Sequence, residues 1–394
     1  MPIKNFKKDH ENEIQNIKTS NEIIEENKKT LKKFYRDLKV KDYSDSRILK
    51  LINYTKLLAK QINKPFQETT KEDIKDLVAW INQRNLADST KRTYKVILKV
   101  FYKWLNDGSH PEKVEWIKTS TSKNNKLPKE LLREKDIKKL LSGAENPRTK
   151  ALISLLWETG ARIGELIDLK IGDIEDHEHG KQIIIDGKTG QRRIPLIESV
   201  PHLRNWLNLH PEPEPENPIW VNVGNTRHGK KSSYRNLRKS LETAKKRAKL
   251  EEKPVNPHHF RHSRATYLAN KFTEAQMCQF FGWVQGSDMP SKYIHLSGRD
   301  IDEAYAQLHG LEDENKKESN LTPKTCPRCK NQNPHDANLC SYCGQALSHE
   351  EFRKFEKAKE DQEEIDVDKQ KLISLIQDYE ENGKISKELL EKLL

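Results

Sequence analysis

The chain has 394 residues, enough for two or three domains with separate cores. Hydrophobic residues make up 34% and charged residues another 34%, and no apolar run approaches the roughly 18 residues of a membrane-spanning helix. These features argue against a membrane protein, and the polar start after Met1 does not resemble a secretory signal, so we expect a cytoplasmic protein. The net charge of +12 and the pI near 9.2 favour a polyanionic partner, most often nucleic acid.

The first third of the chain is expected to be helical. Residues 1–20 are polar and lack helical periodicity, so we expect a loose N-terminal arm there. Four helical patterns follow between about 21 and 106, one of them starting with a capping-box pattern at Thr70. Residues 107–127 contain Gly, Pro, Ser and Asn, which indicates an interdomain linker.

The fourth helical pattern, which begins at Asp88, carries an apolar stripe on one face and a basic stripe on another. The basic residues recur at every fourth position: Lys91, Lys95, Lys99 and Lys103. On an isolated helix, such a stripe is usually a solvated face. In a chain this basic, we predict instead that these lysines contact the phosphates of double-stranded DNA.

Residues 128–312 are predicted to form a mainly helical α+β domain with a small antiparallel sheet. The alternating pattern of 181–196, with Lys-Thr-Gly between two β-rich runs, predicts a hairpin whose turn holds Lys188. Helical patterns resume at about 197–208, 231–249, 261–271, 273–281 and 300–308.

Five short motifs with potential catalytic side chains lie in this domain. They are Thr-Gly-Ala-Arg162-Ile-Gly-Glu165, Gly-Lys188-Thr-Gly, His258-His-Phe-Arg261, Gly-Trp283 and Lys-Tyr293-Ile-His. Attack on a phosphodiester gives a pentacoordinate phosphorus whose non-bridging oxygens gain negative charge, and two guanidinium groups can clamp those oxygens. We assign this clamp to Arg162 and Arg261. His258, three residues before Arg261, can bind the phosphate or accept the phenol proton.

The remaining motifs supply a donor, an acid and a nucleophile. Trp283 offers an indole N–H to a phosphate oxygen but cannot act as a base, and Lys188 in the hairpin turn can protonate a leaving oxygen. A phenol with a pKa near 10 is a poor nucleophile at pH 7, so Tyr293 needs neighbouring positive charge. Each residue alone also has an ordinary structural interpretation, and only their joint occurrence supports catalysis. His262 and Arg264 are expected to be supporting or helix-surface groups.

The order Arg, Lys, His-x-x-Arg, Trp, Tyr resembles the catalytic signature of the tyrosine recombinases, also called the phage-integrase family. The resemblance covers about residues 20–310 and is weaker over 21–106, which is similar to the family's helical, SAM-like core-binding domain. It implies that Tyr293 attacks phosphorus to give a 3′-phosphotyrosine and a free 5′-OH. A second strand's 5′-OH then reverses the step, without ATP or a divalent ion. Trp283 stands where many family members have His, which moves any base role towards His258.

The resemblance also implies that Glu165 orients the active-site helix and that the protein assembles as a dimer or tetramer on DNA. A type IB topoisomerase would share the active site, but it would act as a monomer that lets one strand swivel. The compact N-terminal helical domain and the tail favour the recombinase. A DNA-binding regulator or accessory protein with a degenerate site would keep the basic stripe and tolerate loss of the tyrosine, so the presence of every catalytic residue type argues against it. We therefore expect a site-specific DNA recombinase or integrase.

The cysteine spacing predicts a metal site within residues 321–348. Four of the five cysteines form two Cys-x-x-Cys pairs: Cys326, Cys329, Cys340 and Cys343. In a reducing compartment such thiolates suit a tetrahedral Zn²⁺, whereas a redox pair would explain only one motif. We predict a structural zinc ribbon, with His335 and Asp336 solvated in its loop. A module of this type is seen after the catalytic domain in archaeal integrase-like proteins, which is a further resemblance.

Residues 349–394 are net acidic, with 14 Asp and Glu against 9 Lys and Arg, and are not expected to lie on DNA. We expect a charged helical tail, with a break at Asn382-Gly383. Its apolar residues need a surface to pack against, by default within the same chain and alternatively on a partner subunit.

Overall fold

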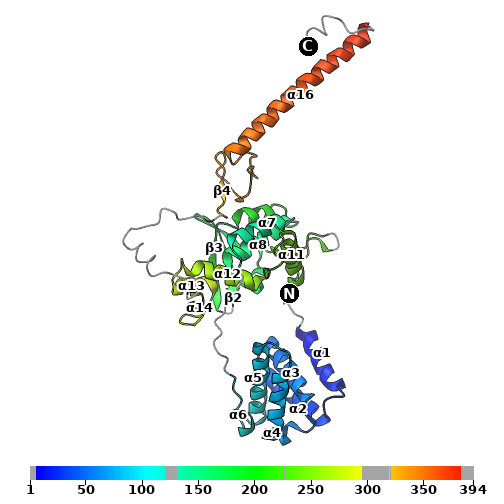
Figure 1. Cartoon of the computed structure of the whole chain (residues 1–394), viewed down its shortest axis with the longest axis vertical. Coiled ribbons are helices and arrows are strands. Elements are labelled where there is room, and N and C mark those ends of the chain that lie inside the picture. Colours follow the sequence, from blue (N-terminus) through cyan, green and yellow to red (C-terminus); the bar gives the residue numbers. More distant parts are fainter. Residues whose placement is uncertain are drawn as a thin grey trace, which may run out of the picture. The chain divides into compact units, whose positions relative to one another are not determined.

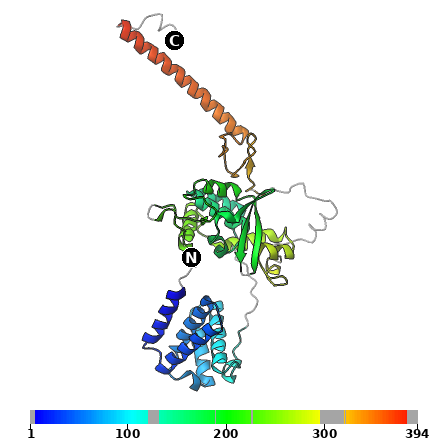
Figure 2. The ribbon, with the colours of Figure 1, turned by 180° about the vertical axis from the view of Figure 1, so that it is seen from behind.

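The computed structural model describes residues 6–119, 131–187, 189–224, 227–294, 319 and 321–382. The chain divides into two compact units, Met1–Lys126 and Leu127–Leu394 (Figures 1 and 2). It is mainly helical, with one three-stranded and one two-stranded antiparallel sheet in the described residues, which confirms the expected fold class. Within the same residues, no helix is both long enough and apolar enough to cross a membrane.

The first unit is a bundle of helices. Its apolar stripes meet in one core in which Phe34, Phe66 and Phe101 are nearly fully buried. The predicted capping box at Thr70 is present, because its side chain and the side chain of Asp73 each accept a hydrogen bond from the other's backbone N–H. The elements are α1 (Phe6–Thr19), α2 (Glu25–Val40), α3 (Asp45–Ala59), η1 (Phe66–Glu68), α4 (Lys71–Gln83), α5 (Asp88–Leu105) and α6 (Glu112–Glu115).

The expected loose arm is wrong for most of its length, because residues 6–19 form α1. Ile17 is fully buried. Much of the remaining contact with α3 is polar, as between Lys56 Nζ and Glu13 Oε2 at 2.5 Å and between His10 Nε2 and Asp45 at 3.1 Å. A helix that packs largely through polar groups gives little hydrophobic periodicity, and its sequence therefore resembles a loop.

The second unit places a small sheet and several helices around the deeply buried α8, and Trp157 and Trp220 lie in its core. The predicted hairpin is confirmed: β2 pairs antiparallel with β3, and Ile183 lies opposite Ile194. The helix expected at 300–308 lies outside the described residues. The elements are α7 (Glu134–Gly143), α8 (Pro147–Thr159), α9 (Ile163–Ile167), η2 (Ile171–Asp173), β1 (Ile174–His177), β2 (Gly180–Gly187), β3 (Gly190–Leu196), α10 (Val200–Leu207), α11 (Tyr234–Arg247), α12 (Pro257–Ala269), α13 (Glu274–Phe281) and α14 (Ser291–Ile294).

Two short strands and one long helix complete the described chain. Strands β4 (Lys324–Thr325) and β5 (Gln332–Asn333) form the cysteine-containing ribbon, and α16 (His349–Asn382) follows it (Figure 1). Helix α16 is one continuous helix up to Asn382, where a break was expected, and the residues beyond it are not described.

Candidate active site

The first turn of α12 positions His258 and Arg261. Asn256 caps the helix by accepting a hydrogen bond from the backbone N–H of His259 at 3.0 Å, and Pro257 occupies the first helical position. Residues three and four apart share one face of a helix, so His258, Arg261 and His262 project from the same side of α12.

A tight turn between α8 and α9 positions Arg162. Gly160 ends α8 with φ +53°, and a Cβ at this position would lie 2.7 Å from Cε1 of Phe281. Arg162 then forms the N-cap of α9. The backbone N–H and the Nη1 of Arg162 each donate a hydrogen bond to the carboxylate of Glu165 at 2.9 Å.

Arg192 of β3 joins this turn to α13, a contact that the sequence analysis did not anticipate. Its Nη2 donates to Glu165 Oε2 at 2.8 Å, and its Nε donates to the carbonyl of Phe280 at 3.0 Å. Burial acts to raise the pKa of Glu165, but hydrogen bonds from Arg192 and Arg162 outweigh it and hold that pKa below its usual value. Glu165 is therefore an ionised link between two arginines.

Arg162, His258 and Arg261 meet at an open pocket of about 470 Å³. Arg261 is buried, and it donates from Nη1 to the carbonyl of Gly160 at 3.1 Å and from Nη2 to that of Phe281 at 2.6 Å. Burial, with help from Arg162, lowers the pKa of Arg261 to about 10, so it stays charged at pH 7. The pocket is lined by Arg162, Ile163, Tyr234, Arg238, Asn256, Pro257, His258 and Arg261.

Arg238 of α11 is a third guanidinium at this pocket, and the sequence analysis missed it. Helix α11 is rich in basic residues along most of its length, with Lys245, Lys246 and Arg247 in its last turn. One arginine in such a helix gives no distinguishing signal, and only the fold shows that it faces the pocket.

Tyr293 lies beside the pocket and is linked to it by two histidines. Its phenol oxygen is 2.7 Å from Nδ1 of His262, and Nε2 of His262 is 2.9 Å from Nε2 of His258. Trp283 stacks on Tyr293, with ring centroids 5.3 Å apart and planes at 8°. Tyr293 is only 3% exposed, and burial raises its pKa although Arg261 acts in the opposite direction. The phenol is therefore protonated at pH 7.

Lys188 lies outside the described residues, but the hairpin turn that holds it lies beside this site. Thr189 Oγ1 donates to the carbonyl of Gly282 at 3.3 Å. A Cβ on Gly187 would lie 2.7 Å from Glu165 Oε1, so the end of β2 packs directly on the Glu165 carboxylate.

The lysine stripe of α5 divides into two kinds of side chain. Lys91 Nζ donates to the carbonyl of Asn82 at 2.8 Å, and Lys99 Nζ donates to those of Glu115 and Ile117. Within the described part of the first unit, Lys95 and Lys103 form no ion pair or hydrogen bond. Of the four lysines in the stripe, these two are the ones whose side chains have no partner within the described part of the unit. Lys103 is exposed and is therefore the more accessible of the two.

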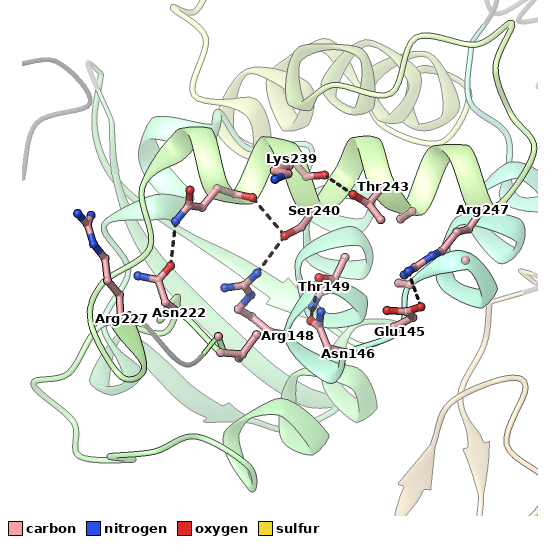
Figure 3. A pocket seen from close by; sticks show the side chains of 16 residues that line it. Glu145, Asn146, Arg148, Thr149, Asn222, Arg227, Lys239, Ser240, Thr243 and Arg247 are labelled. Carbon is pink, nitrogen blue, oxygen red and sulfur yellow. Dashed lines mark hydrogen bonds and ion pairs between the residues drawn. The ribbon is translucent and has the colours of Figure 1, made fainter.

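A second pocket, also of about 470 Å³, lies against a different face of α11 (Figure 3). Arg148 reaches from α8 to Ser240 Oγ at 2.9 Å, and Arg247 pairs with Glu145 at 2.5 Å. These contacts fasten α11 to α8 and the α7–α8 turn. None of the sequence-predicted site residues is among the described residues that line this pocket.

The four predicted metal ligands are brought together in the ribbon. Their sulfur atoms lie within 4.8 Å of one another, with 3.6 Å between Cys326 and Cys343 and between Cys329 and Cys340. A tetrahedral site with Zn–S bonds of 2.3 Å needs sulfurs about 3.8 Å apart. The arrangement is therefore compatible with zinc.

Residues 130–299 match the profile of the phage integrase family, and residues 30–112 match that of the phage integrase N-terminal SAM-like domain. The tyrosine recombinase XerD of Listeria monocytogenes is 26% identical over 247 residues, covering 61% of this chain and 82% of the relative. XerA of Pyrococcus horikoshii is 29% identical over 233 residues, covering 57% and 75%. A tyrosine recombinase of Synechococcus elongatus is 31% identical over 126 residues, and the match spans 31% of this chain but only 39% of that relative.

Solved structures show the same fold at low sequence identity. The Tn1549 transposon integrase, in complex with transposon right-end DNA, aligns with a TM-score of 0.55 at 18% identity over 72% of this chain and 99% of that one. A λ integrase tetramer bound to a Holliday junction aligns with a TM-score of 0.53 at 15% identity, covering 66% and 77%.

The two profile matches together cover more than half of the chain, and the matched region contains all the pocket residues described above. The chain belongs to the phage integrase family, the tyrosine recombinases. It is therefore a site-specific DNA recombinase, as the sequence analysis predicted.

Proposed function

We propose that this recombinase cleaves and rejoins DNA through a 3′-phosphotyrosyl intermediate on Tyr293. The phenolate oxygen bonds to phosphorus, and the bond from phosphorus to the 5′ oxygen breaks. That oxygen takes up a proton, from Lys188 in our proposal, and leaves as a 5′-OH. The 5′-OH of another strand then attacks the phosphotyrosine and frees the phenol. Each step exchanges one phosphate ester for another, so neither ATP nor a divalent ion is needed for the chemistry.

The observation that supports this proposal best is the hydrogen-bonded row Tyr293–His262–His258, which ends at the pocket of the two arginines. Arg162, whose side chain is 41% exposed, and the buried Arg261 would clamp the non-bridging oxygens. The phenol must turn out of its stack on Trp283 to reach a phosphate, because Tyr293 is buried. In this proposal Trp283 holds the nucleophile, and its indole N–H remains available to the phosphate.

We further propose that the chain binds double-stranded DNA and assembles on it as a dimer or tetramer. The net charge of +12 supports this proposal, and so do the related λ integrase structures, a dimer bound to a core site and a tetramer bound to a Holliday junction. Lys95 and Lys103 are the members of the α5 stripe that we assign to phosphate contacts, together with Arg238 at the catalytic pocket. Lys91 and Lys99 are assigned mainly to the internal contacts that they make.

We also propose that the four cysteines hold a structural Zn²⁺. The donor set and the sulfur spacing fit, and the ribbon has only two strands of two residues each. Such a module cannot bury enough apolar surface to fold alone, so its folding would depend on the metal.

The test is relaxation of supercoiled plasmid, and of plasmids carrying candidate inverted repeats, in a buffer without added divalent ions. Wild type is compared with Tyr293→Phe, and covalent protein–DNA adducts are trapped with detergent. EDTA is added in a separate arm after the zinc content is measured, because chelation acts on the ribbon as well. We expect a 3′-linked adduct with wild type and none with Tyr293→Phe.

Two other outcomes would decide against the proposal. Tight DNA binding by both proteins, without an adduct on any substrate, would indicate a DNA-binding regulator with a degenerate site. Relaxation by a monomer, without strand exchange between two repeats, would indicate a topoisomerase-like enzyme.

A further inference from the structure

We propose that His202, His335 and Asp336 form a second divalent-metal site, which fastens the ribbon to the catalytic unit. His202 belongs to α10, and the other two residues follow β5 in the ribbon. One ligand atom from each lies within 4.8 Å of the other two. Both ribbon residues were expected to be solvated; Asp336 is exposed, but the ring of His335 is half-buried, with its centroid 6.5 Å from that of His202.

The state of His202 is the first argument for a ligand. It is 5% exposed, and the described chain has no hydrogen bond to its ring, but neither ring nitrogen is among the fully enclosed side-chain atoms without a partner. The ring nitrogens are therefore still open to a further partner, which can be water or a metal ion.

The second argument is that an independent contact brings the ribbon to this place. Arg204, on the same helix as His202, donates from Nη1 to Asn331 Oδ1 at 3.1 Å and from Nη2 to the carbonyl of Gln332. Once the four cysteines have folded the ribbon, the strand that leads to His335 is thus held against α10 independently of the second site. Because these contacts already restrict the ribbon, metal binding costs less conformational entropy, which favours it.

The geometry requires a modest closure. Zinc bonds of 2.0–2.1 Å to nitrogen and oxygen place tetrahedral ligand atoms about 3.3 Å apart, so the side chains must approach by up to about 1.5 Å. Side-chain rotations can supply this change, and a water molecule would be the fourth ligand. The neighbouring charges are mixed, because Lys138, Lys150 and Lys324 oppose a cation while Asp336 and Glu198 favour it. We therefore expect weaker binding than at the four thiolates.

The two metal sites would have different structural roles. The four cysteines would fold the ribbon, whereas the mixed site would join it to α10. Helix α10 packs closely on α8, which ends at the Arg162 turn, so the anchored ribbon would be continuous with the catalytic core.

The test is zinc stoichiometry in the full-length protein. Reduced, metal-free protein is titrated with Zn²⁺ against a competing chelator, and the bound metal is counted by mass spectrometry after gel filtration. Wild type should bind two ions, whereas His335→Ala, Asp336→Asn and His202→Ala should bind one. The matched control is His228→Ala, which removes an exposed histidine elsewhere in the unit and should still bind two. Co²⁺ separates the sites, because only the thiolate site gives strong sulfur-to-metal charge-transfer absorption in the near ultraviolet.

The expected Co²⁺ result is a second increment of weak visible absorption without added charge transfer, lost in the three variants. One zinc ion in wild type would overturn the proposal, and so would two ions in wild type and in all three variants. If His202→Ala fails to fold, His335→Ala and Asp336→Asn decide, because both residues lie at the ribbon surface.

Discussion

The phenol oxygen of Tyr293 lies 2.7 Å from Nδ1 of His262. Burial and the neighbouring His258 lower the pKa of His262 to about 4, so the ring is neutral at pH 7 and can accept a hydrogen bond from the phenol. In the tautomer that accepts at Nδ1, the Nε2–H of His262 donates to His258, whose ring lines the pocket. In the proposed mechanism this row gives the proton of Tyr293 a path to His258 that does not cross bulk water.

We predict that His262→Asn slows single-turnover DNA cleavage by about 100-fold or more, the usual contribution of a positioned base. Asparagine can keep a hydrogen bond to the phenol but cannot take its proton. Because the two histidines act as one relay, the double variant with His258→Asn should be little slower than the slower single variant. His228→Asn serves as the exposed control. A rate within threefold of wild type for His262→Asn would refute the relay.

The lowered pKa of His262 also predicts how stability changes with pH. The unfolded chain takes up a proton near pH 6.5, whereas the folded chain does so only near pH 4. Acidification through this window therefore favours unfolding, at up to about 1.4 kcal/mol per pH unit for one group. We expect urea titrations to show that wild type loses about 1–2 kcal/mol more stability than His262→Asn between pH 7 and pH 5. Equal losses would contradict the prediction.

Glu165→Gln should damage both stability and catalysis, because it leaves Arg192 buried without its carboxylate. Loss of one partner of a buried ion pair typically costs roughly 3–5 kcal/mol. Arg162 would lose its orienting contact as well, so cleavage should slow even at a temperature where the variant is folded. The pKa of Glu165 is lowered, so its contribution is present above the usual pKa of glutamate and is lost as pH falls below it. Wild type and Glu165→Gln should therefore converge in melting temperature on acidification, whereas a constant difference would argue against the charge.

The residues that lie in recognisable short motifs were predictable from the sequence. Arg162, His258 and Arg261 were expected at one site and line one pocket. His262 was taken for a supporting or surface group, although its spacing of four residues from His258 already placed both on one face of the helix. This spacing indicated that His262 faces the site, but only the fold shows that Tyr293 approaches that face of the helix.

The contacts that depend on distant parts of the chain could not be predicted in this way. Arg192 and Arg238 are two of many basic residues, and no local pattern shows that one meets Glu165 while the other faces the pocket. Helix α1 was missed because much of its packing is polar. His202 and His335 are more than 100 positions apart, and only the docking of the ribbon on α10 brings them together.

Removal of metal should unfold the ribbon and leave the catalytic unit folded. The ribbon has no core of its own beyond its cysteines, whereas the catalytic unit has a large apolar core. We expect EDTA, or Cys340→Ser, to speed proteolysis within residues 321–348 at least tenfold, with cleavage sites mapped by mass spectrometry. The control is Cys278→Ser, which removes the cysteine outside the cluster. A ribbon that stays protected without metal would contradict a structural zinc site.

The basic stripe of α5 allows a matched comparison between two lysines on the same helix. Lys103 is exposed, so Lys103→Ala should weaken DNA binding and lower the slope of log affinity against log salt by about 0.9, the value for one phosphate contact. Lys99 instead donates to the carbonyls of Glu115 and Ile117, so Lys99→Ala should lower the melting temperature and leave the slope nearly unchanged. Fluorescence anisotropy at several salt concentrations and thermal unfolding measure the two effects. The reverse pattern would assign the DNA contact to Lys99 and show that the internal hydrogen bonds give way when DNA binds.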